Sequence, residues 1–216
     1  MFIGHFGVAF AAKRLAPRTS LGTLFFAAQF LDLTWPIFLL LGLEHVRIVP
    51  GITKMSPFDF YDYPITHSLV TALGWSLAVG SAYYVLRRSV RAAATVGMAV
   101  LSHWVLDFLV HRPDLPLWPG GPKVGLALWN FWVLATVLEI SIFVGGIWIY
   151  LNATRTRDGV SRYGFWIMAA SLFVGWVASL VAGAPPSERA MAWGALSMWI
   201  FVPWAWWVDR HREIMG

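Results

Sequence analysis

Six long apolar segments constrain this chain more than any other feature of its sequence. They cover about residues 20–43, 64–86, 92–111, 124–151, 163–183 and 189–208. A helix needs roughly 20 apolar residues to cross the hydrocarbon core of a bilayer, and each segment reaches this length. Only 12% of the residues are charged, whereas about 25% is typical of a soluble domain. We therefore predict an integral membrane protein of the all-α class, a polytopic helical bundle.

A seventh apolar segment, at about residues 2–16, is shorter than the hydrocarbon core requires. We expect a partly inserted or re-entrant helix here, which gives six to seven spans in total. Pro36 is expected to kink the segment 20–43 just after Asp32, because proline removes a backbone donor. The segments use the whole chain, so we predict a single transmembrane domain over residues 1–216.

The Lys and Arg residues divide unevenly between alternate connections of the predicted bundle. One set of connections carries eleven of them, and the other set carries five. The positive-inside rule places the richer set in the cytoplasm. The N-terminus and the loops 44–63 and 112–123 are then expected on the outer face, with the C-terminus in the cytoplasm. These loop residues account for the net charge of +5, so we expect no nucleic-acid partner.

Ionisable residues gather in one part of the predicted bundle. His103, Asp107 and His111 are spaced at i, i+4 and i+8 in one apolar segment, so they fall within roughly 80° on one helix face. An ionisable group facing hydrocarbon costs several kcal/mol, so these side chains are expected to turn inward. The others are His5, Asp32, His67 and Glu139. All lie in a polar half at about residues 1–151, whereas the apolar helices at about 163–208 carry none.

These residue types indicate a metal site. The chain has no cysteine, so a metal has to be held by His, Asp and Glu. We expect His5, His67, His103 and Asp107 as ligands, with Asp32 either a ligand or a residue that orients one. Imidazoles with carboxylates favour Zn²⁺, and Mn²⁺ or Mg²⁺ would suit more oxygen ligands; one or two ions fit the set. Further candidates are His111, Asp114 and Asp62.

Each of these residues also has a purely structural interpretation. His5 could lie in the membrane interface, and Thr66-His67-Ser68 could be a polar helix start in which hydroxyls cap backbone amides. His103 and Asp107 could form a pair that only locks two helices together. The convergence of the whole set is the stronger evidence for a site.

Four motifs in the first half of the chain resemble a bacterial family of membrane-bound, metal-dependent hydrolases, which includes a LexA-regulated inner-membrane protein. They are Gly4-His5, Asp32, Thr66-His67-Ser68, and Ser102-His103 followed by Asp107, in the family's order. The resemblance implies a hydrolase of the bacterial inner membrane. Two positions depart from the family pattern, because Asp32-Leu33-Thr34 replaces an Asp-x-Asp and Asp62-Tyr63 replaces a His-Arg. A second metal, and an arginine that grips the substrate, are therefore less expected here.

The function that we predict is divalent-metal-dependent hydrolysis in the outer half of the bilayer. Glu139 or Asp32 is the candidate general base, and Ser68 or Ser102 is a candidate hydrogen-bond donor to the substrate. The expected depth of the site favours a lipid or lipid-linked substrate, with a phosphoester preferred.

Three other classes of function remain open from the sequence. Buried Asp, Glu and His residues also form the pathways of ion- or proton-coupled transporters and channels, although no motif repeats in the second half. A ceramidase-like hydrolase would need a His-x-x-x-His in its last helix, and the segment 189–208 has no histidine. A structural membrane protein with a buried polar cluster is the third class. The oligomeric state is left open.

Overall fold

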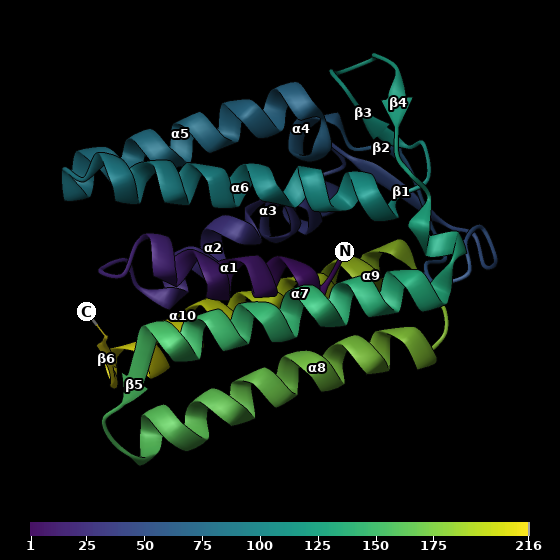
Figure 1. The fold of residues 1–216 in the computed structure, drawn as a ribbon. Helices are drawn as coiled ribbons and strands as arrows, with labels where there is room; N and C mark the ends of the chain where they lie inside the picture. The colour runs from purple at the N-terminus through teal and green to yellow at the C-terminus, as the bar shows by residue number, and fades with distance from the viewer. Residues whose placement is uncertain (216) are drawn as a thin grey trace.

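The computed structural model describes residues 1–215 as a helical bundle, with 68% of the chain in helices (Figure 1). Four helices are long and apolar enough to cross a membrane. They are α5 (Leu69–Arg87), α6 (Val90–Val110), α7 (Trp132–Ala153) and α8 (Phe165–Val181), the last extended by the π-helical turn η2 (Val160–Gly164). Large apolar side chains are exposed along these helices, as expected of surfaces that contact lipid. An all-α bundle with membrane-type helices is therefore confirmed.

The six to seven predicted spans are not confirmed, because four helices of the described residues are long and apolar enough to cross a membrane, or up to five if one bent pair counts as a single span. Residues 20–43 form α2 (Leu21–Ala28) and α3 (Phe30–Leu40), which are bent by 56° and make a fifth span only if taken together. The break lies at Gln29, whereas Pro36 stays inside α3.

The last predicted segment stays helical from Glu188 to Arg210 but changes its helix type along the way. Residues 189–208 form the helix α9 (Glu188–Leu196), the 3-10 turn η3 (Ser197–Ile200) and the helix α10 (Phe201–Arg210). None of the three is long enough to cross a membrane by itself.

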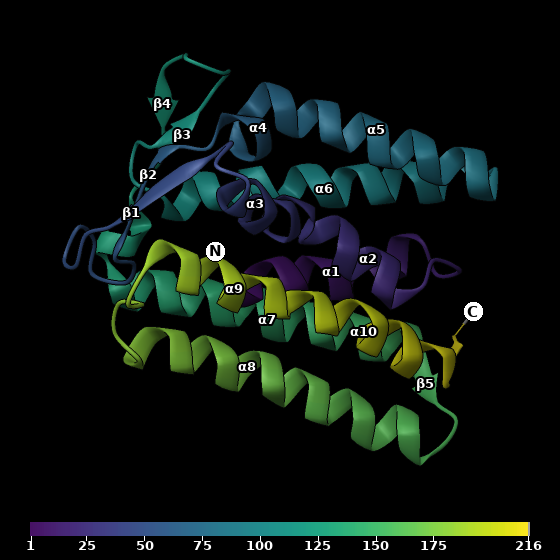
Figure 2. The same ribbon diagram turned by 180° about the vertical axis from the view of Figure 1, so that it is seen from behind.

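The short first segment forms the helix α1 (Ile3–Leu15) at the centre of the bundle, packed against α7, α2 and α6 (Figures 1 and 2). Its 13 residues extend over about 20 Å, which is less than a bilayer core. Protein surrounds this helix instead of lipid, and Phe6 and Phe10 both make edge-on contacts with Phe25. A short apolar helix is sufficient in such a position.

Glycines let α1 and α7 approach each other closely. A Cβ atom at Gly146 would lie 2.0 Å from the Gly7 carbonyl oxygen, and one at Gly7 would lie 2.4 Å from the Ile142 carbonyl oxygen. Small residues at a contact allow two helix backbones to meet in this way. The contact fixes the first turn of α1, which carries His5, against α7.

Short strands and turns connect the helices at the two ends of the bundle. The strand β1 (His45–Ile48) pairs antiparallel with β2 (Phe58–Asp62), and the register places Ile48 opposite Phe58. The remaining short elements are α4 (Pro64–His67), β3 (Leu115–Pro116) paired with β4 (Lys123–Val124), η1 (Leu128–Asn130), and β5 (Thr154–Thr156) paired with β6 (Arg212–Ile214). In Figure 1 the hairpins β1–β2 and β3–β4 lie at one end, and β5–β6 lies at the other.

A buried ion pair joins the end of α1 to the end of α10 near the β5–β6 hairpin. Lys13 Nζ donates to Asp209 Oδ2 at 2.6 Å, and both side chains are less than a tenth exposed. Asp209 also accepts hydrogen bonds from the Leu21 backbone N–H and from the Tyr150 hydroxyl. This network ties α10 to α1, α2 and α7.

Candidate metal centre

Histidine and aspartate side chains from four helices converge inside the bundle. His5 lies in the first turn of α1, Asp32 lies in the first turn of α3, and His67 is the last residue of α4. His103 and Asp107 lie one turn apart on α6. The three histidines and Asp107 are at most 3% exposed, and the Asp32 side chain is 23% exposed. The structure thus brings together all five residues that were predicted as metal ligands.

A backbone hydrogen bond fixes how His103 faces this cluster. Its Nδ1 lies 2.8 Å from the Ala28 carbonyl oxygen, so Nδ1 carries the proton and donates it. The other ring nitrogen, Nε2, is buried and makes no hydrogen bond of good geometry, although Asp107 Oδ2 and Asp32 Oδ1 lie 3.3 and 3.5 Å from it. In a neutral ring it holds a lone pair. A buried polar atom without a hydrogen bond is unusual, and a role in binding a cation is one ordinary explanation.

His67 is oriented by a hydrogen-bonded chain that includes Thr66 and Glu44. The Thr66 hydroxyl donates to Glu44 Oε2 at 2.7 Å and lies 2.7 Å from His67 Nδ1. Glu44 also accepts the backbone N–H groups of Ile65 and Thr66, and its burial raises the pKa of its carboxyl group. The Nδ1 of His67 is therefore its protonated nitrogen, and Nε2 is free to face the cluster. Glu44 was not among the predicted site residues, and its only signal in the sequence is its place at the end of an apolar segment.

Two histidine nitrogens and two carboxylate oxygens of the cluster lie close to one another. Asp32 Oδ1 is 3.5 Å from both His67 Nε2 and His103 Nε2. Asp107 Oδ2 is 3.3 Å from His103 Nε2 and 3.8 Å from His67 Nε2. Four atoms bound tetrahedrally at about 2.0–2.2 Å are about 3.3–3.6 Å apart. These four separations lie in or slightly above that range. Asp32, His67 and His103 have ligand atoms that all lie within 4.8 Å of one another, so these three side chains could hold an ion, with Asp107 as the nearest further donor.

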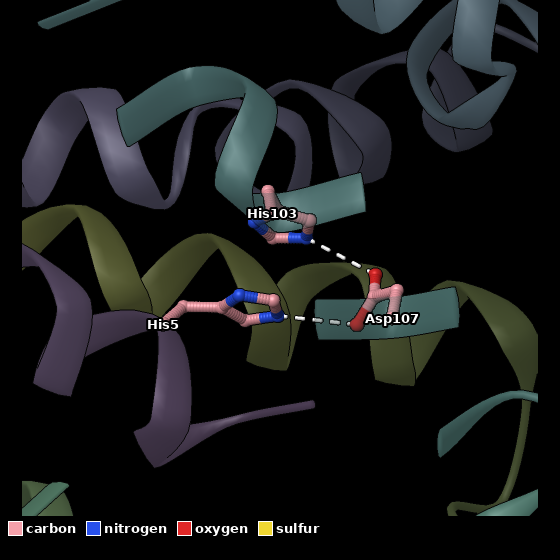
Figure 3. Close-up of side chains that lie close together, drawn as sticks. All are labelled: His5, His103 and Asp107. Atoms are coloured by element: carbon pink, nitrogen blue, oxygen red, sulfur yellow. Dashed lines mark hydrogen bonds and ion pairs between the residues drawn. The ribbon is translucent and has the colours of Figure 1, made fainter. Parts of the chain in front are cut away.

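His5 and His103 approach different oxygens of the Asp107 carboxylate (Figure 3). Their rings are stacked, with centroids 3.6 Å apart, and His5 Nε2 is 3.2 Å from Asp107 Oδ1. His5, His103 and Asp107 therefore form a second group of three potential ligands, which shares His103 with the group of Asp32, His67 and His103. His103 has one free nitrogen, so its Nε2 can bind one ion only.

The start of the chain lies inside the bundle beside this cluster. The Met1 amine donates to Asp107 Oδ1, and the backbone N–H groups of Phe2 and Gly4 lie 3.0 and 3.4 Å from Glu139 Oε2. These bonds bury Met1, and the side of the membrane that the N-terminus faces stays a prediction. Glu139 thus caps the start of α1, and it also lines the cavity described below.

A second polar group lies next to Asp107. His111 Nδ1 is 3.0 Å from Asp114 Oδ1, and His111 Nε2 is 3.9 Å from Asp107 Oδ2. The Tyr63 hydroxyl donates to Asp114 at 3.3 Å, and its burial, followed by the charge of Asp114, raises the pKa of Tyr63 well above 10. Because His111 donates to Asp114 through Nδ1, its Nε2 lone pair faces Asp107 and the cavity.

The other three predicted site residues lie outside the cluster. The Ser68 hydroxyl accepts the Thr71 backbone N–H and caps α5, and the Ser102 hydroxyl donates to the Ala99 carbonyl of its own helix. Asp62 is about half exposed on the β1–β2 hairpin, where its Oδ2 lies 2.9 Å from His45 Nδ1. Their roles in the structure are local.

A cavity of about 770 Å³ opens from the cluster. Asp32, His67, Asp107, His111 and Glu139 line one part of it. The loop before β2 and residues of α8 and α9, among them Trp176 and Met191, line the remainder. This volume is typical of a site for a small organic ligand. The participation of α8 and α9 was not predicted from the sequence.

Comparisons of the chain with protein families, with curated proteins and with solved structures each found no match. The candidate site therefore depends on the geometry of these side chains alone.

Proposed function

We propose that this protein is a membrane-embedded hydrolase that depends on a divalent metal ion, with Zn²⁺ favoured, and acts on a lipid or lipid-linked substrate. The observation that carries the proposal is the convergence of Asp32, His67 and His103, whose ligand atoms lie within 4.8 Å of one another, with Asp107 Oδ2 3.3 Å from His103 Nε2. Two imidazoles and two carboxylates form a donor set that suits Zn²⁺. His5 and Glu44 would act from outside this set, by holding Asp107 and His67 in place.

Hydrolysis needs an activated water and a group that moves protons. A bound Zn²⁺ would lower the pKa of a water ligand to about 7. The His111–Asp114 pair is the better placed proton acceptor, because His111 lines the cavity and its Nε2 lies 3.9 Å from Asp107 Oδ2. Glu139 already accepts two backbone N–H groups, which favours a structural role over the general-base role predicted from the sequence. Such a proton-transfer group typically contributes about 10²–10⁴ in rate.

The resemblance and the distribution of basic residues support a place in the bacterial inner membrane. The connections that carry most of the Lys and Arg residues lie at the end of the bundle with β5 and β6, away from the β1–β2 hairpin (Figure 1). Under the positive-inside rule that end is cytoplasmic, and the cavity lies toward the outer leaflet. A phosphoester in a lipid head group is the favoured target at this depth.

Elemental analysis of the detergent-purified protein tests the metal site directly. We expect near-stoichiometric zinc in the wild type after reconstitution and its loss in His103→Ala and Asp107→Asn. His45→Ala is the matched control, because the His45–Asp62 pair has similar chemistry on an exposed hairpin. Zinc-loaded protein with His111→Gln should keep its metal but lose most hydrolysis of phospholipid vesicles. A wild type that binds no metal in excess Zn²⁺ or Mn²⁺ would refute the proposal.

A further inference from the structure

The part of the cavity away from the metal cluster lies between α8 and α9. Ser171, Gly175 and Ser179, spaced at i, i+4 and i+8, line it from one face of α8. Met191 and Gly194 line it from α9. One continuous cavity therefore extends from the buried polar cluster to α8 and α9. No ionisable residue of these two helices lines the cavity.

Small residues in this part of the molecule leave space instead of closing it. At Gly7 and Gly146 an added Cβ would collide with a neighbouring backbone, so those glycines permit close helix packing. At Gly175 and Gly194 no heavy atom lies within 4 Å of the Cβ position. Both glycines are exposed, so the cavity opens to the outside between α8 and α9.

The packing of α8 is consistent with such an opening. Near its start, Phe165 is fully buried, lies edge-on to Phe10 and stacks on Tyr150. Farther along the helix, Val174 and Val181 are 63% and 77% exposed. One end of α8 is thus held by the core, whereas the end nearer the α8–α9 turn borders the opening. In a membrane this opening faces lipid.

We propose that this groove between α8 and α9 admits an amphiphilic substrate from the bilayer and holds its hydrocarbon chain, while its polar head reaches the metal cluster. The inference rests on the proposed function and adds a direction of entry and a site for the chain. The occupant follows from the continuity of the cavity, because one molecule filling it needs a polar end at Asp107 and an apolar end beside Trp176. A water-soluble substrate would leave the apolar end unfilled.

Photolabelling with hexadecyl phosphate that carries a diazirine near its chain end tests this groove. The probe would be added to the full-length, zinc-treated protein in phosphatidylcholine nanodiscs, and labelled peptides would be mapped by mass spectrometry. Gly175→Leu and Gly194→Leu fill the groove, and leucine is a better helix former than glycine. Gly74→Leu is the matched control, since Gly74 is also an exposed helical glycine with an open Cβ position, but lies on α5.

We expect the labelling to be concentrated in residues 171–201 and to be competed by unlabelled hexadecyl phosphate. It should be lost in Gly175→Leu and Gly194→Leu and kept in Gly74→Leu. Labelling spread evenly over the exposed helices, or unchanged by both groove substitutions, would overturn the inference even in a protein that binds zinc. A wild type without metal that still shows the groove-dependent labelling would refute the proposed hydrolase while supporting the groove. The two proposals can therefore fail separately, because the labelling requires no hydrolysis.

Discussion

Replacing Thr66 by valine tests whether His67 binds the metal without altering His67 itself. Thr66 is fully buried, and its hydroxyl lies 2.7 Å from both Glu44 Oε2 and His67 Nδ1. The hydroxyl proton goes to Glu44, which has only acceptors when ionised, so the hydroxyl oxygen accepts the His67 Nδ1–H. Valine has a similar shape but no hydrogen-bonding group. The substitution therefore leaves the Nδ1–H of His67 without an acceptor.

The expected size of the effect follows from the two tautomers of His67. A buried donor without a partner costs about 1–3 kcal/mol. A neutral imidazole can avoid this cost by moving its proton to Nε2, the atom that lies 3.5 Å from Asp32 Oδ1. That tautomer cannot bind a metal through Nε2. At about 1.4 kcal/mol for each factor of ten, zinc affinity should fall about 10- to 100-fold.

Zinc titration against a competing chromophoric chelator, on detergent-solubilised protein, measures this change. Thr71→Val is the control, because it removes a hydroxyl one turn into α5 that donates to Pro64 and Ser68 carbonyls. Both substitutions remove a local hydrogen bond, so thermal stability should fall in both, and zinc affinity only in Thr66→Val. If Thr66→Val binds zinc as tightly as Thr71→Val, His67 does not bind the metal through an Nε2 that depends on the Thr66 hydrogen bond.

Two further predictions concern the packing that holds the site. Gly146→Ala places a methyl group against the Gly7 carbonyl and should lower the free energy of unfolding by about 1–3 kcal/mol. Gly145→Ala meets no atom within 4 Å and should raise it by up to about 1 kcal/mol; equal shifts in Tm would contradict the close approach. Lys13→Met leaves the buried Asp209 carboxylate without its counter-charge and should cost about 3–5 kcal/mol. The double variant Lys13→Met with Asp209→Leu should recover part of the lost stability, as measured by thermal unfolding. If it recovers none, the broken ion pair is not the cause of the loss.

The sequence predicted the site better than it predicted the helices. The spacing of His103 and Asp107 defines one helix face regardless of where that helix ends, and the cost of burying ionisable groups requires partners for them. His5, Asp32 and His67 are those partners in the structure. Hydropathy windows, by contrast, average over about 20 residues and cannot resolve a break one residue long.

The helix breaks and the candidate site depend on the same long-range hydrogen bonds, which explains why the sequence did not reveal the breaks. The break at Gln29 leaves the Ala28 carbonyl to accept from His103 Nδ1 at 2.8 Å. The break at Ser68, between α4 and α5, leaves the His67 carbonyl to accept from Trp104 Nε1 at 2.9 Å. Backbone groups freed inside a membrane protein have to find such partners, because lipid offers none. Adjacent residues of α6 supply both donors, so the helix that carries His103 and Asp107 also stabilises the breaks that present Asp32 and His67.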